Sequence, residues 1–327
     1  MGLNRINSTT LEVASSGDKS YTINLETLPE NHVGDFLALR LLGNASRGAS
    51  PALHEPEVFS QILKQVQLLK GSSVCEIEYE PLDGHDLEVL HRYRHKKRKP
   101  NAQVPAANAS GNTPVDHVFF LPLTPPVAEF LASAFRPETE SMVGLEIKTL
   151  WNVSDVFDAA DITGFSGQLE WYIESRPGSN AEYPRGVLKI GKETTIPKTS
   201  LELTQHEVIQ VLMRSRDTFD YVALKSGNED VYSQMTSLML DRCNAKHYGT
   251  SLDTTLETSA EPSLVVPMRW DEDGDTNIDE TVKEYTCLFD QRDKKGVWGK
   301  KKFTFTNKST AATADFGYLV SYMKDAE

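Results

Sequence analysis

The chain has 327 residues, a formal net charge of −13, 39% hydrophobic residues and 25% charged residues. This composition is typical of a globular protein that can bury one large core or two cores of about 150 residues each. It contains no run of 18 apolar residues, which argues against a transmembrane helix. An acidic surface also argues against a protein whose whole face tracks nucleic acid.

The N-terminal segment and the cysteines indicate the compartment. The first 22 residues lack the continuous apolar core of a secretory signal, so we expect the chain to stay where it is made. Cys75, Cys243 and Cys287 lie far apart and form no CxxC pair. We interpret them as small buried hydrophobic residues in a reducing compartment.

Alternation of apolar and polar residues predicts β-strands along most of the chain. In residues 20–26, Ile23 and Leu25 alternate with polar residues, and in residues 74–80 Ile77 and Tyr79 alternate with glutamates. Further strands are predicted at residues 144–151, 167–175, 219–226, 282–289, 301–307 and 315–323. This pattern is typical of antiparallel sheets with one wet face, and the lack of regular strand–helix alternation argues against a parallel α/β fold.

Two helices are predicted. Residues 85–97 place Leu87 and Leu90 on one side, with cations at the C-terminal end, where the helix dipole favours them. Residues 228–243 place Val231, Met235, Leu238 and Met239 on one stripe, after an acidic first turn. Residues 59–71 fit either a helix or a strand.

The predicted elements indicate an internal duplication. A strand, a polar turn and a helix occur in each half, with an offset of 147 residues from Ile77 to Leu224. Segment 174–186 is the best candidate boundary, which gives units at residues 1–180 and 181–327. Two long polar segments, 100–114 and 249–263, are predicted loops in corresponding places, and such loops often contact other molecules.

No catalytic constellation is apparent. "GFSG" at residues 164–167 is followed by Gln168, where the nucleophile elbow requires glycine. Glu76, Glu78 and Glu80 lie on one face of a predicted strand, as expected for a solvated sheet surface rather than for paired catalytic carboxylates. We therefore predict no enzyme activity, no small-molecule substrate and no cofactor.

The acidic segment "WDEDGDTNIDE" (270–280) is a weak calcium candidate. Asp271, Asp273 and Asp275 have the spacing of the first three EF-hand ligands, but position six is Thr276 rather than glycine. The segment is therefore not an EF-hand. It is either a looser calcium site or a plain acidic loop.

The sequence "HRYRHKKRKP" (residues 91–100, the basic run) opposes the charge of the rest of the chain. It holds six cations and no acid: Arg92, Arg94, Lys96, Lys97, Arg98 and Lys99. His91 and His95 have the spacing of a metal pair, but the cations between them would repel a metal ion. The run is a solvated helix end, a contact with an anionic surface of phospholipid or nucleic acid, or a partner for an acidic surface of a neighbouring subunit.

Several stretches resemble one protein family. They are "LNRINSTTLEVASSGDKSYTINL" (3–25), "RYRHKKRKP" (92–100), "GLEIK" (144–148), "FDYVALKSGNEDVYSQMTSLMLDRCNAKHYG" (219–249) and "FTFTN…YLVSYM" (303–323). Together they resemble the double jelly-roll major capsid proteins of tailless icosahedral bacteriophages, of the corticovirus and tectivirus type.

The resemblance implies an all-β fold of two tandem eight-stranded jelly rolls with a few short helices. It further implies a structural protein, made in the host cytoplasm, that forms pseudo-hexagonal homotrimers. These trimers would tile the icosahedral shell of a virion and contact minor capsid or vertex proteins. The six cations of the basic run would then face an internal lipid membrane or the packaged genome.

Two other functions remain open from the sequence. One is a β-rich virion spike or carbohydrate-binding module, which would present aromatic residues in a groove. The residues to inspect for this are Trp151, Trp171, Trp270 and Trp298. The other is a β-sandwich enzyme acting on glycans, which would need two carboxylates converging in a cleft.

Overall fold

The structure is a computed structural model that describes eighteen stretches of the chain. They are residues 2–14, 17–48, 60–69, 77–95, 112–123, 137–157, 159–178, 186–195, 200–203, 207–215, 221–226, 229–236, 239, 268–269, 281–282, 285–290, 303–308 and 316–325.

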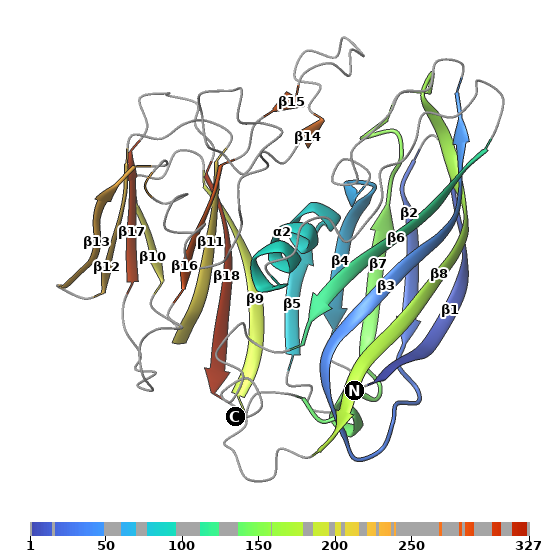
Figure 1. Ribbon diagram of the computed structural model, residues 1–327, viewed down its shortest axis with the longest axis horizontal. Helices are drawn as coiled ribbons and strands as arrows, with labels where there is room; N and C mark the ends of the chain where they lie inside the picture. Colours follow the sequence, from blue (N-terminus) through green and yellow to red (C-terminus); the bar gives the residue numbers. More distant parts are fainter. Residues whose placement is uncertain are drawn as a thin grey trace.

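The first half of the chain forms two four-stranded groups (Figure 1). The first group has the order β1-β8-β3-β6, formed by Gly2–Ala14, Ile162–Pro177, His32–Arg47 and Asn112–Pro122. The second has the order β2-β7-β4-β5, formed by Lys19–Asn24, Glu146–Trp151, Leu63–Leu69 and Ile77–Leu82. Neighbours within each group run antiparallel.

The second half repeats this arrangement. One group has the order β9-β18-β11-β16, formed by Gly186–Thr195, Phe316–Asp325, Glu207–Ser215 and Tyr285–Asp290. The other has the order β10-β17-β12-β13, formed by Ser200–Leu203, Phe303–Lys308, Tyr221–Ser226 and Glu229–Met235. A short ladder joins β14 (Met268–Arg269) to β15 (Thr281–Val282).

The strand orders match element by element, which confirms the predicted duplication. β1, β8, β3 and β6 correspond to β9, β18, β11 and β16, whereas β2, β7, β4 and β5 correspond to β10, β17, β12 and β13.

Even a local irregularity is repeated in the two halves. In the first half Val66 pairs with Leu82 and Leu68 pairs with Tyr79, so β4 advances by two residues while β5 advances by three. In the second half Val222 pairs with Met235 and Leu224 pairs with Tyr232, which is the same step. The predicted offset was wrong in detail, because Ile77 lies in β5 and Leu224 lies in β12, the counterpart of β4.

A parallel strand pair joins the two halves into one sheet. β5 runs beside β9, with Ile77 opposite Leu188, Glu78 opposite Lys189 and Tyr79 opposite Ile190. The result is an eight-stranded sheet with the order β16-β11-β18-β9-β5-β4-β7-β2. Main-chain pairing therefore holds the two halves side by side along the long axis of the molecule (Figure 1).

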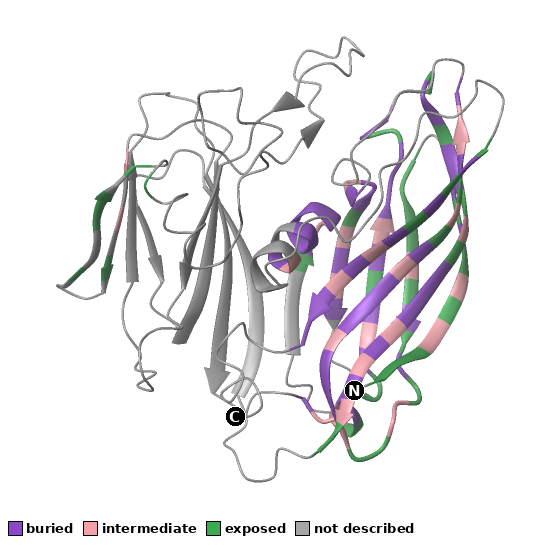
Figure 2. Ribbon diagram, viewed as in Figure 1, coloured by how far each residue is buried: buried purple, intermediate pink, exposed green. Residues whose placement is uncertain are grey.

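The core of the first half lies between its two sheets (Figure 2). Side chains alternate across each strand, so every second residue points inward. The central inward positions of β3 and β8 are fully buried apolar residues, and Trp151 of β7 packs edge-on to Phe119 of β6. Burial of one such side chain stabilises the fold by about 1.5–3 kcal/mol. The central core residues of these two strands are Leu37, Leu39, Leu41, Leu169, Trp171 and Ile173.

Each predicted strand overlaps an observed strand, but the helix predicted at residues 228–243 is wrong over residues 229–235. Glu229–Met235 form strand β13 on β12, and Met239, the one described residue of 237–243, is helical. Val231 and Met235 share a face in a strand as well as in a helix, so the pattern did not distinguish the two. Pairing with β12 outweighs the acidic first turn, and Asp230 forms an ion pair with Lys225 across the strands.

The remaining predictions differ in smaller ways. The helix predicted at residues 85–97 is confirmed as α2, Gly84–His95. The ambiguous segment 59–71 contains strand β4. Residues 112–114 of the loop predicted at residues 100–114 belong to β6, and residues 174–177 of the boundary segment belong to β8. Residues 100–111 lie outside the described residues. Segment 249–263 lies outside the described residues.

Candidate functional site

Helix α2 begins at a defined cap. The Asp86 backbone N–H donates to Oδ1 of Asp83 at 2.7 Å, and the Asp83 backbone N–H donates to Oδ2 of Asp86 at 3.0 Å. This reciprocal pair satisfies two backbone donors at the start of the helix, and the negative charge suits that end of the helix dipole. The polar turn predicted before the helix, "PLDG" (81–84), supplies the capping residue Asp83.

Buried contacts then fix α2 against β6. Nε2 of His117 lies 3.1 Å from Oε1 of Glu88, and both side chains are buried. The His91 ring stacks on Phe120 with ring centroids 4.3 Å apart. The helix also packs against β4 and lies near the middle of the long axis (Figure 1).

These contacts place the start of the basic run. Arg92 and Arg94 lie in the last turn of α2, where cations are favoured. The other four predicted contact residues, Lys96, Lys97, Arg98 and Lys99, lie outside the described residues. The run therefore begins at a fixed helix end in the first half of the molecule.

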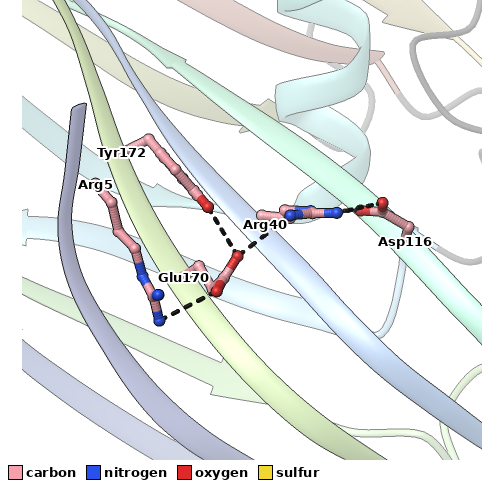
Figure 3. Close-up of polar contacts among 5 residues, drawn as sticks. All are labelled: Arg5, Arg40, Asp116, Glu170 and Tyr172. Carbon is pink, nitrogen blue, oxygen red and sulfur yellow. Dashed lines mark hydrogen bonds and ion pairs between the residues drawn. The ribbon is translucent and has the colours of Figure 1, made fainter. Parts of the chain in front are cut away.

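A row of alternating charges crosses the outer face of the β1-β8-β3-β6 sheet (Figure 3). We call it the charge ladder: Arg5, Glu170, Arg40 and Asp116, one residue from each strand. Nη2 of Arg5 lies 3.1 Å from Oε1 of Glu170, and Nη1 of Arg40 donates to Oε2 of Glu170 at 3.4 Å. Arg40 also donates from Nε and Nη2 to both Asp116 oxygens, at 2.7 Å and 2.6 Å.

Glu170 is the centre of the ladder. The Tyr172 hydroxyl donates to its Oε2 at 2.9 Å, so this carboxylate has three partners. The Glu170 side chain is only 8% exposed, although it points away from the core. Buried charges are tolerated when they are paired and hydrogen-bonded, as Glu170 is.

The Arg40–Asp116 pair of the ladder is shifted toward its charged forms. The hydrogen bonds from Arg40 are the main reason that the pKa of Asp116 lies below its usual value. The hydrogen bonds to Asp116 in turn raise the pKa of Arg40 above its usual value. On β8, burial and the nearby Asp35 carboxylate raise the pKa of Glu174.

The ladder has no net charge, because two arginines face two acids. Such a row can be buried in a contact without leaving an unpaired ion. The chain as a whole has a net charge of −13, so the neutral row differs from the average surface. Exposed apolar side chains lie on the same strands, namely Leu3 on β1 and Leu42 on β3. Sequence patterns alone did not predict this row. The signal was Arg40 inside the apolar segment "FLALRLL" (36–42).

The alternative functions find little support in the described residues. Within these stretches, no group of three or more His, Cys, Asp or Glu residues could hold a metal ion. The calcium candidate Asp271, Asp273 and Asp275 lies outside them. Trp151 and Trp171 are fully buried in the core and line no groove, while Trp270 and Trp298 are outside the described residues. No helix among the described residues is long and apolar enough to span a bilayer.

Comparison of sequences finds no relatives. The chain matches no protein-family model and no curated protein.

Comparison of structures finds similarity over the full length. The major capsid protein of Sulfolobus turreted icosahedral virus (STIV) superposes with a TM-score of 0.58 at 13% identity, over 98% of this chain and 97% of that one. The major capsid protein of bacteriophage PM2 superposes with a TM-score of 0.55, also at 13% identity, over 100% of this chain and 98% of that one. The chain has a double jelly-roll fold.

The double jelly-roll fold matches the strand order of the chain. Each jelly roll is a pair of four-stranded sheets, and the two jelly rolls repeat the same strand order. In this double jelly roll, the β1-β8-β3-β6 sheet of the first unit carries the charge ladder, and α2 packs against β6 and β4 of the same unit.

Proposed function

We propose that the chain is the major capsid protein of an icosahedral virus, a structural protein without catalytic activity. The observation that carries the proposal is the duplicated jelly roll, which matches two viral major capsid proteins over nearly their whole lengths. Its place is the capsid of the virion. Three copies form a trimer of six jelly rolls, and neighbouring trimers tile the shell.

The two jelly rolls divide at residues 1–180 and 181–327. The proposal rests on β8 ending at Pro177 and β9 beginning at Gly186, with every strand of the first unit before this segment. Each unit contains two complete sheets, so each can bury its own core.

The basic run contacts an anionic layer beneath the shell, either an internal membrane or the packaged genome. Support comes from the last turn of α2, which carries Arg92 and Arg94 and leads into four further cations. Each cation near an anionic lipid surface contributes on the order of 1 kcal/mol, and a shell would present the run in many copies.

The virus is a tailless bacteriophage of the corticovirus or tectivirus type, whose minor and vertex proteins complete the shell. The stretches quoted from the sequence and the full coverage of the bacteriophage PM2 protein support this lineage.

Light scattering coupled to size-exclusion chromatography tests the function. One chain has a mass of 36.5 kDa, so a trimer would have a mass of about 110 kDa. We expect this species, or larger shells, at low and high salt. A chain that remains monomeric under all conditions would contradict the capsid proposal and favour a discrete binding module.

A further inference from the structure

The parallel strand pair that joins the two jelly rolls has a symmetry-related counterpart that does not form within one molecule. β5 and β9, each at the border of its own four-stranded group, pair in parallel and join the two jelly rolls. The duplication makes β13 the counterpart of β5 and β1 the counterpart of β9. The counterpart of this junction is therefore a parallel pair of β13 with β1.

Within one molecule that pair cannot form. β13 lies at one end of the long axis and β1 lies at the other (Figure 1). Each is the outermost strand of its sheet among the described strands. A strand edge of this kind presents main-chain donors and acceptors that can pair with another chain.

The main chain of β1 faces outward at alternate residues. The Glu12 backbone N–H donates to the Tyr21 hydroxyl at 2.8 Å, and that hydroxyl donates to the Glu12 carbonyl at 3.1 Å. The Glu12 N–H and C=O therefore point away from β8. In the antiparallel ladder, Glu12 and Ser166 form a non-hydrogen-bonded pair. The Tyr21 hydroxyl thus occupies, at the Glu12 end of β1, the hydrogen-bonding position that a neighbouring strand would take along the β1 edge.

The two strands also carry charges of opposite sign. In the internal junction, Glu78 of β5 stands opposite Lys189 of β9. β13 begins with two acids, and the Asp230 side chain is 57% exposed. β1 carries Arg5, whose side chain is 47% exposed.

The registers of the two junctions can be matched. β1 and β9 both begin with glycine and both place a base opposite a tyrosine, Arg5 opposite Tyr172 and Lys189 opposite Tyr322. Tyr232 of β13 occupies the place of Tyr79 in β5, because each pairs with the equivalent leucine.

From these correspondences we infer that β13 of one copy pairs in parallel with β1 of the next copy. Asp230 then lies opposite Asn4, Val231 opposite Arg5 and Tyr232 opposite Ile6. The inference rests on the proposed capsid function and specifies how its subunits meet. The contact is head-to-tail, and such contacts close into a ring when the rotation fits. In a ring of three copies, internal and inter-copy junctions alternate around six jelly rolls.

Disulfide trapping tests the pairing in the full-length chain. The double variant Arg5→Cys/Val231→Cys places one thiol on each partner strand at paired positions. After mild oxidation we expect most chains to migrate as covalent dimers and trimers on a non-reducing gel, and as monomers after reduction. The two single variants control for bonds to the three native cysteines. Arg5→Cys/Lys225→Cys is the matched control, because Lys225 lies on β12, one strand further from the edge.

The outcomes separate this inference from the proposed function. A wild-type trimer whose 5/231 variant cross-links no more than the control would overturn the strand pairing and leave the capsid role intact. A wild-type chain that stays monomeric would overturn both. Covalent ladders longer than three copies would confirm the pairing but overturn the closed ring.

A charge swap adds a second readout that needs no cysteine. Asn4→Asp places an acid directly opposite Asp230 in this register, so we expect at least a tenfold weaker trimer at low salt, with the chain still folded by circular dichroism because Asn4 is exposed and lies outside the charge ladder. Adding Asp230→Arg in the same chain restores opposite charges and should restore the trimer. Failure of the second change to rescue the first would contradict the proposed register.

Discussion

The two faces of the β1-β8-β3-β6 sheet differ although they are built from the same four strands. The inner face is apolar, with Leu39, Leu169 and Trp171 fully buried. The outer face carries the charge ladder, in which Arg5 and Asp116 are about half exposed. The difference indicates that the inner face determines whether the unit folds, whereas the outer face and the β1 edge remain available to determine what the unit contacts.

The largest effect is expected from the inner face. Trp171→Ala should lower the free energy of unfolding by about 3–5 kcal/mol, because it leaves a cavity in a closely packed core. Leu42→Ala, on the outer face of β3, is the matched control and should cost less than about 1 kcal/mol, since Leu42 is already 37% exposed. Denaturant titration measures both changes. Equal losses would contradict the division between the faces.

A smaller effect is expected at the centre of the ladder. Glu170→Gln leaves Arg5 and Arg40 without their shared carboxylate, and should lower the free energy of unfolding by about 1–2 kcal/mol, because both arginines keep substantial contact with water. Glu12→Gln, at an exposed position of β1, should change it by less than about 0.5 kcal/mol. Thermal melting compares the two, and indistinguishable melting temperatures would show that the ladder contributes nothing to folding.

The smallest effect is a pH dependence at the end of the ladder. The folded state holds the pKa of Asp116 below its usual value of about 3.9, so its contribution is complete above that pH and is lost as the pH falls through the lower folded value. The contribution should not exceed about 1 kcal/mol, because Asp116 is half exposed. Wild type and Asp116→Asn should therefore differ in unfolding free energy at pH 6, and the difference should shrink as the pH falls below the usual pKa of an aspartate, about 3.9. A constant difference across that range would contradict the pKa shift.

Much of the fold could be predicted from the sequence because its strands alternate strictly. β2, β7 and β8 have one apolar and one polar face, and helix α2 begins at an aspartate cap. Strand β3 was missed for the opposite reason. It has apolar residues on both faces around Arg40, so its alternation is hidden. The helix predicted over β13 failed because Val231 and Met235 fit either period.

The site could be predicted only in part. The charge ladder joins residues 5, 40, 116 and 170, which are brought together by strand order and not by spacing along the chain. Local patterns carry no information on which strand lies beside which. The same holds for the β5–β9 junction, which became visible only with the register of both halves. The basic run could be identified from the sequence, because its cations are consecutive or nearly consecutive residues.

Electron microscopy of the purified chain is the most direct test of the central claim, that two joined jelly rolls form the building unit of a capsid. The account predicts ring-shaped particles of three two-lobed copies, with a six-lobed outline, and shells where such rings assemble further. Single two-lobed particles under every condition in which the chain is folded would contradict it.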